Sequence, residues 1–132
     1  MTHTKTIQSL YAVFGRGDIA TILEHASDQI DWDHTSLASH ACPWNGNFSG
    51  KSRLPGFFKA LADNLDFTVF EPRAFVETGN HVAVELRIES TLKKNGRHMA
   101  GDSVHFWTFD ADGKVAKYRH FNDTAQELVA WK

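Results

Sequence analysis

The stretch HFWTFDADGKVAKYRHFNDTA, residues 105–125, has the pattern of two strands, a tight turn and the start of a helix. Asp112-Gly113 separates two strand-like segments, and such a pair accepts the positive φ angles that a hairpin turn needs. Asp123 is followed three residues later by Gln126, a spacing typical of a helix capping box. We therefore expect the chain to end in an antiparallel hairpin and a short helix.

Further strands precede this hairpin. The pattern predicts strands at about 67–78, 82–89, 97–109 and 114–122, joined by turns at Gly79-Asn80, Asn95-Gly96 and Asp112-Gly113. Pro72 interrupts the first of them, which indicates an edge strand or a bend. The second half of the chain is thus expected to be a long antiparallel meander.

The first half is predicted to be mostly helical. Apolar residues at helical spacing indicate helices over about 7–14 and 19–26, separated by Gly15-Arg16-Gly17, with Asp18 as N-cap of the second. After these helices the period changes to two, so that Ile30, Trp32 and His34 share one buried strand face.

Residues 35–50 are rich in Gly, Asn and Pro and are expected to form an irregular loop, whose length is typical of a functional or lid-like loop. Ser52 is the expected N-cap of a third helix, with Pro55 in its first turn.

Composition limits the classes of partner. The 132 residues suit one domain, 1–132, with a single core. A net charge of −2 without a run of Lys or Arg argues against nucleic acid or an anionic membrane surface as partner. The single cysteine, Cys42, excludes an internal disulfide and a cysteine-based metal site. No segment reaches the roughly 20 apolar residues of a membrane helix, so we expect a soluble, cytoplasmic domain.

Helices followed by an antiparallel meander define an α+β class. The segments GDIATIL (17–23), SDQIDWDH (27–34), WNGNFSGKSRLPGFF (44–58) and the 105–125 stretch resemble the nuclear transport factor 2 superfamily, in particular its SnoaL-like and ketosteroid-isomerase-like branch. The resemblance implies a cone-shaped curved antiparallel sheet wrapped around three N-terminal-half helices and enclosing an apolar pocket. It also implies a homodimer, formed through the outer sheet face that bears Glu85, Arg87 and Glu89.

The resemblance places histidines at the catalytic positions of ketosteroid isomerases. His34 falls where those enzymes keep an aspartate base, and His105 where they keep a protonated aspartic acid that stabilises an oxyanion. The tyrosine of that oxyanion hole would fall at Leu10. Tyr11 lies one residue further, roughly 100° around the helix, and is expected to point elsewhere. The usual steroid-isomerase groups are therefore replaced.

The strand pattern supports His34 independently, because it shares the face of Trp32. Both faces of the His105 strand are apolar, and the resemblance selects the face of His105 and Trp107. On the last strand, it selects the face of His120. The expected catalytic residues are His34, His105 and His120, and the expected ligand-binding residues are Trp32, Trp107, Tyr118, Asn122, Phe58 and Trp44. Each histidine also has a structural interpretation: His34 as a core-edge side chain bonded to a backbone carbonyl, His105 as a structural residue, and His120 as a surface residue.

Other polar residues are weaker candidates. Asp31 and Asp33 straddle Trp32 and are expected on the solvated face, whereas Asp102 is placed at the cavity rim, within reach of a histidine. His40, Cys42 and Trp44 are expected to close the cavity, with the Cys42 thiol buried and inert.

Two functions stay open. The first is a cofactor-independent isomerase, cyclase or dehydratase acting on a small apolar carbonyl compound, with His34 as base. The second is a non-catalytic domain that binds an apolar metabolite. No metal and no cofactor are expected, because the three histidines lie on separate strands and no HxH or HExxH motif is present.

Overall fold

The computed structural model describes residues 2–35 and 41–132, which form four α-helices, one short 3-10 helix and six strands. The helices are α1 (Thr2–Gly15), α2 (Ile19–Glu24), α3 (Leu54–Asn64) and α4 (Thr124–Trp131), and the 3-10 helix is Lys51–Arg53. The strands are β1 (Ala26–His34), β2 (Gly46–Asn47), β3 (Leu65–Thr78), β4 (His81–Leu92), β5 (His98–Phe109) and β6 (Val115–Phe121). The α+β class is confirmed.

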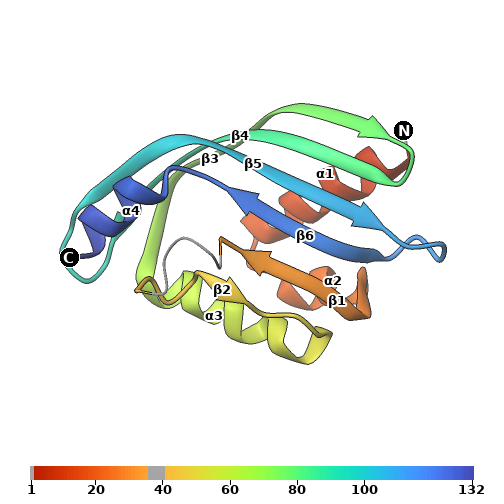
Figure 1. The fold of residues 1–132 in the computed structure, drawn as a ribbon, viewed down its shortest axis with the longest axis horizontal. Coiled ribbons are helices and arrows are strands. Elements are labelled where there is room, and N and C mark those ends of the chain that lie inside the picture. Colours follow the sequence, from red (N-terminus) through yellow and green to blue (C-terminus); the bar gives the residue numbers. More distant parts are fainter. Residues whose placement is uncertain (1, 36–40) are drawn as a thin grey trace.

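One sheet contains all six strands in the order β2-β1-β6-β5-β4-β3. Strands β3 to β6 form the predicted antiparallel meander, and the long strands curve over the helices (Figure 1). The expectation of a purely antiparallel sheet is wrong at one place, because β1 pairs with β6 in parallel. The sheet is therefore mixed and not closed, with β2 and β3 at its edges.

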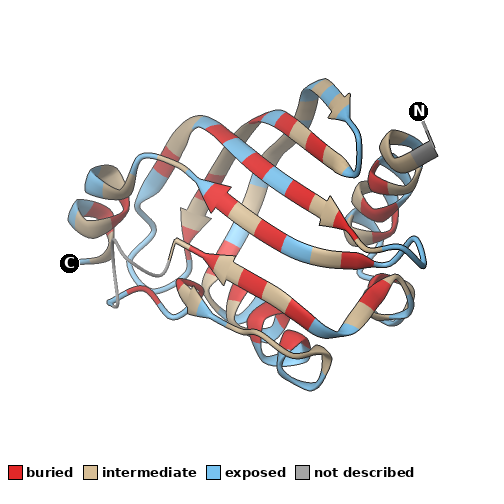
Figure 2. Ribbon diagram, turned by 45° about the vertical axis from the view of Figure 1, so that its right-hand side comes forward, coloured by how far each residue is buried: buried red, intermediate tan, exposed pale blue. Residues whose placement is uncertain are grey.

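The core lies on the concave side of this sheet. Buried and exposed residues alternate along the central strands (Figure 2), as expected for strands with one solvated face. Helices α1 and α3 contribute apolar side chains to the same core, among them Ile7, Leu54 and Phe57. The predicted edge position of Pro72 is confirmed, and the register of β3 shifts directly after it.

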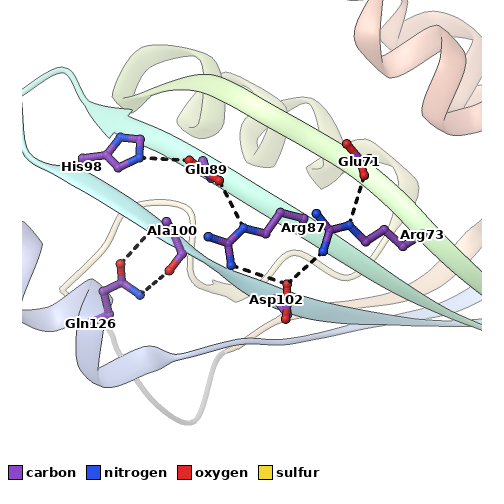
Figure 3. A network of polar contacts seen from close by, with 8 residues as sticks. All are labelled: Glu71, Arg73, Arg87, Glu89, His98, Ala100, Asp102 and Gln126. Atoms are coloured by element: carbon purple, nitrogen blue, oxygen red, sulfur yellow. Dashed lines mark hydrogen bonds and ion pairs between the residues drawn. The ribbon is translucent and has the colours of Figure 1, made fainter.

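Two predicted helix starts need correction. Ser52 does not cap α3: it lies in the 3-10 helix, and the N-cap position of α3 is Arg53, whose side chain makes no capping bond. Asp123 does cap α4, but Gln126 does not complete a capping box. Its amide instead bonds the backbone of Ala100 in β5, accepting from N at 2.8 Å and donating to O at 2.9 Å (Figure 3). Gln126 thus ties α4 to the sheet.

Within the described residues, no helix is both long and apolar enough to cross a membrane.

Candidate functional site

Strand register brings the three histidines into one row. On the β1–β6 pair His34 lies opposite His120, and on the β5–β6 pair His105 lies opposite the same His120. The next row, two residues along each strand, consists of Trp32, Tyr118 and Trp107. The site is therefore built from two parallel rows of rings across three neighbouring strands.

The rings of these rows are in contact. The centroids of His34 and His120 lie 3.9 Å apart in stacked planes, and those of His120 and His105 lie 5.1 Å apart. Trp32 stacks on Tyr118 with centroids 3.9 Å apart.

A partly open cavity of about 120 Å³ lies against both rows. Apolar side chains of α1 and α3 form much of its lining. All nine residues expected from the sequence line it: His34, His105, His120, Trp32, Trp107, Tyr118, Asn122, Phe58 and Trp44. All nine therefore lie at the cavity, as expected.

The ring of His34 is oriented by residues of the 41–50 segment and of α4. Its Nδ1 lies 3.1 Å from Oδ1 of Asn45, and Asn45 donates from Nδ2 to Glu127 Oε2 at 2.8 Å. Because the carboxylate of Glu127 can only accept, the amide oxygen of Asn45 faces His34. An amide oxygen also only accepts, so the proton of His34 lies on Nδ1 and the lone pair on Nε2.

The ring of His105 has the opposite arrangement. The hydroxyl of Tyr11 accepts a hydrogen bond from Trp107 Nε1 at 3.1 Å and lies 2.8 Å from His105 Nδ1. Because Trp107 can only donate, it uses one lone pair of the hydroxyl, and we assign the Tyr11 proton to Nδ1 so that this proton is paired and the remaining ring proton is left for a ligand. The proton of His105 then lies on Nε2, which makes this ring a neutral hydrogen-bond donor toward the cavity.

This position of Tyr11 corrects the sequence prediction. Leu10 and Tyr11 both line the cavity, together with Phe14. The curved sheet surrounds a wide arc of α1, so neighbouring helix positions about 100° apart both face it. The long side chain of Tyr11 then reaches the histidine row.

His120 lies between the other two rings and contacts Thr35. The Thr35 hydroxyl lies 3.0 Å from His120 Nδ1 and within 3.4 Å of Asn122 Oδ1. Thr35 has a φ angle of 55°, which a β-branched residue rarely adopts. Such strained backbone is concentrated at functional sites.

Burial keeps all three rings neutral. It lowers the pKa of His34 to about 4, although the hydrogen bond to Asn45 acts in the opposite direction. Burial also lowers the pKa values of His105 and His120 well below their usual range, and the neighbouring imidazoles add to this effect. Burial raises the pKa of Tyr11 and of Tyr118, so both hydroxyls keep their protons.

Several polar atoms of the residues that line the cavity form no hydrogen bond with the described part of the chain. Trp32 Nε1 is the one fully buried side-chain N or O atom of the described residues that lacks a hydrogen bond. Within the same residues no hydrogen bond is formed by the Tyr118 hydroxyl or by the Nε2 atoms of His34 and His105. A bound polar ligand would supply the missing partners.

The remaining candidates lie outside the chemistry of the cavity. Asp31 makes a bidentate ion pair with Arg119, as expected for the outer face, and this hydrogen bonding lowers its pKa. Asp102 does not reach a histidine, because its exposed carboxylate lies 3.6 Å from Arg87 and 4.0 Å from Arg73 (Figure 3).

In the 41–50 segment, Cys42 is buried, as expected. Trp44 is also buried, and its Nε1 donates to Glu127 Oε1 at 3.1 Å. The expectation for His40 falls outside the described residues.

The described residues contain no group of three His, Cys, Asp or Glu side chains arranged to hold a metal ion. The histidine row is a stack of rings rather than a convergent ligand set, since His34 and His120 are nearly parallel, with planes 9° apart. The arrangement therefore suits proton transfer and hydrogen bonding.

Sequence reasoning missed four residues of the site: Tyr11, Thr35, Asn45 and Glu127. Tyr11, Thr35 and Asn45 contact a histidine ring, and Glu127 contacts Asn45; none of the four lies at a predicted strand position. The one available signal was Asn45, which lies inside the WNGNFSGKSRLPGFF segment.

The comparisons with known proteins agree with this fold. The SnoaL-like domain model matches residues 7–118. The chain therefore belongs to the SnoaL-like family. The comparison with curated proteins finds no match.

Several solved structures share the fold. An NTF2-like protein of unknown function from Burkholderia pseudomallei superposes with a TM-score of 0.89 at 21% identity, covering 100% of this chain and 98% of the other. TerC, co-crystallised with polyporic acid, has a TM-score of 0.85 at 25% identity and covers 99% and 98%. A protein from Mesorhizobium loti, proposed to be a SnoaL-like polyketide cyclase, has a TM-score of 0.73 at 19% identity and covers 92% and 100%.

Proposed function

We propose that the cavity binds a small, largely apolar carbonyl compound and catalyses proton transfer on it without a cofactor. The observation that carries this proposal is the different partner of Nδ1 in two histidines of one row, an amide oxygen for His34 and a hydroxyl for His105, from which we assign opposite tautomers. His34 presents a lone pair at Nε2, and His105 presents N–H at Nε2. An enolisable O=C–C–H unit needs such a pair, a base for its carbon proton and a donor for its oxygen.

The reaction follows from these groups. Nε2 of His34 takes a proton from the carbon next to the carbonyl, the electron pair of that C–H bond forms a carbon–carbon double bond, and the π pair of the carbonyl moves onto its oxygen. His105 Nε2–H stabilises the resulting enolate by a hydrogen bond, with His120 and Tyr118 beside it. The His34 imidazolium then returns the proton, to another carbon in an isomerisation or to a leaving hydroxyl in a dehydration.

The low pKa of His34 restricts the substrate class. An imidazole with a pKa of about 4 is a weak base, so the C–H group must already be acidic. Carbon positions activated by two carbonyls, or by a carbonyl and an aromatic ring, meet this condition. The co-crystallisation of TerC with polyporic acid supports a small organic molecule as the ligand.

Cavity size adds a second restriction. A cavity of about 120 Å³ is close to engineered apolar cavities of roughly 150 Å³ that bind benzene. One ring therefore fits against the row of Trp32, Tyr118 and Trp107, with an oxygen toward the histidine row. Larger ligands would require the lining side chains to move.

The test uses single-ring enolisable ketones such as phenylacetone and cyclohexane-1,3-dione. Binding is followed by tryptophan fluorescence, and catalysis by NMR detection of deuterium uptake from heavy water. We expect His34→Ala to abolish protein-catalysed exchange, whereas His98→Ala, a change to an exposed ring outside the cavity, leaves it unchanged. Exchange that persists in His34→Ala would remove His34 from the mechanism.

The second candidate function, a non-catalytic binding domain, is favoured by the largely apolar lining of the cavity, which suits binding by packing alone. Binding of these ketones without exchange in the unaltered protein would select it. Failure of the whole set to bind would contradict the proposed ligand class.

A further inference from the structure

Glu127 is a buried carboxylate that the proposed reaction does not use. It lies on α4 at the cavity and is 5% exposed. Within the described residues it has no cationic partner, and its two oxygens accept hydrogen bonds only from Trp44 Nε1 and Asn45 Nδ2. Burying a carboxylate without a counter-charge is costly, so an apolar residue would serve packing better.

The carboxylate determines how Asn45 is oriented. Two donors, the Trp44 indole and the Asn45 amide, point at one residue that can only accept. The Asn45 NH2 group is therefore held toward Glu127, and its oxygen is held toward His34 Nδ1 at 3.1 Å. Rotating the amide by 180° would place NH2 against His34 and oxygen against carboxylate.

We propose that Glu127 is a positioning residue that holds the proton of His34 on Nδ1, acting through Asn45, and so keeps the Nε2 lone pair directed to the cavity. The inference rests on the proposed function for its catalytic consequence. The position of the proton itself does not depend on whether the protein turns over any substrate.

Glu127→Gln is the variant that isolates this role, because it keeps the size and shape of the side chain. The introduced amide has one oxygen and one NH2 group. Trp44 can only donate, so it retains the oxygen, and the NH2 group then faces Asn45. The side-chain amide of Asn45 then rotates by 180°, which removes the clash of two NH2 groups and places the Asn45 NH2 group against His34. His34 Nδ1 must then accept, and the proton moves to Nε2.

The measurement is long-range ¹H–¹⁵N correlation NMR on protein with ¹⁵N-labelled histidine, near pH 7. Protonated and unprotonated ring nitrogens resonate far apart, so the spectrum identifies the nitrogen that carries the proton. We expect the proton of His34 on Nδ1 in the unaltered protein and on Nε2 in Glu127→Gln. A matched control is Glu24→Gln, the same substitution at an exposed side chain of α2 that does not line the cavity.

The outcomes are separable from those of the proposed function. A proton on Nε2 of His34 in the unaltered protein overturns the inference, whether or not the variant folds. An unchanged Nδ1 proton in folded Glu127→Gln also overturns it. If the proton moves as expected and the unaltered protein catalyses exchange, the variant should lose at least about tenfold in exchange rate. If the proton moves and no exchange is ever found, the positioning role stands and the enzymatic function falls.

Discussion

Two tyrosine hydroxyls at the cavity differ in their hydrogen bonding. The hydroxyl of Tyr11 is bonded to Trp107 and His105, whereas the hydroxyl of Tyr118 has no partner among the described residues. We expect Tyr11→Phe to lower the free energy of unfolding by about 1–3 kcal/mol, because Trp107 Nε1 and His105 Nδ1 both lose their partner. Urea denaturation measures this loss.

Tyr118→Phe is the matched control, since it removes a hydroxyl from the same cavity without breaking a protein hydrogen bond. We expect it to change stability much less and to weaken ligand binding instead. Equal losses of stability in the two variants would contradict the hydrogen-bond network assigned to Tyr11.

The predictable residues of the site are those that strand alternation places on the inner face. Strand alternation places His34 there, the family resemblance selects the faces of His105 and His120, and all three are buried at the cavity. The supporting residues were not predictable, because their roles depend on contacts between distant segments. Glu127 meets Asn45 only after α4 packs at the end of the sheet, and nothing in either local sequence specifies that contact.

At the level of elements, the turns and strands of the meander were predictable from local chemistry. Gly79, Gly96 and Gly113 take the positive φ angles that the three turns require. Strand pairing was less predictable, since β1 joins the sheet beside β6, a strand that lies about 80 residues later in the chain. Such long-range pairing leaves no local pattern.

The face that helix α4 buries cannot be inferred from the positions of its apolar residues. Its eight residues bury Glu127 and Ala130, whereas Val129 is 67% exposed. An apolar stripe read from the sequence would have turned the helix to face Leu128 and Val129 inward. The bond of Gln126 to the Ala100 backbone and the bonds to Glu127 set the actual rotation.

At the scale of the whole molecule, the outer sheet face carries apolar residues among charges. Val104 and Phe121 lie opposite each other on β5 and β6 and are 39% and 57% exposed. Arg87, Glu89 and Asp102 form an ion-pair network on the same face (Figure 3). We expect two copies to pair through this face, because an exposed apolar group with polar surroundings is typical of an interface.

Phe121→Asp should convert the expected dimer into a monomer, as measured by light scattering coupled to size-exclusion chromatography. Val129→Asp is the control, because Val129 is similarly exposed but lies on α4. An unaltered protein that is monomeric at every concentration would contradict the expected dimer.

Acid sensitivity is the last whole-molecule property that follows from the histidine row. Burial lowers the pKa of His34 to about 4 and the pKa values of His105 and His120 well below their usual range. In the unfolded chain the same rings bind protons at about pH 6.5. Between these values the unfolded chain binds more protons, so the free energy of unfolding falls as pH decreases, by up to about 1.4 kcal/mol per pH unit for each ring. The carboxyl groups with lowered pKa values, such as Asp31 and Glu89, lose their stabilising effect only at lower pH.

Urea denaturation from about pH 7 to about pH 5 should therefore show a steep fall in the free energy of unfolding. The fall should be shallower in His120→Gln, because one of the three rings no longer binds a proton on unfolding. A free energy of unfolding that stays constant across this range would mean that the rings are not buried as neutral groups.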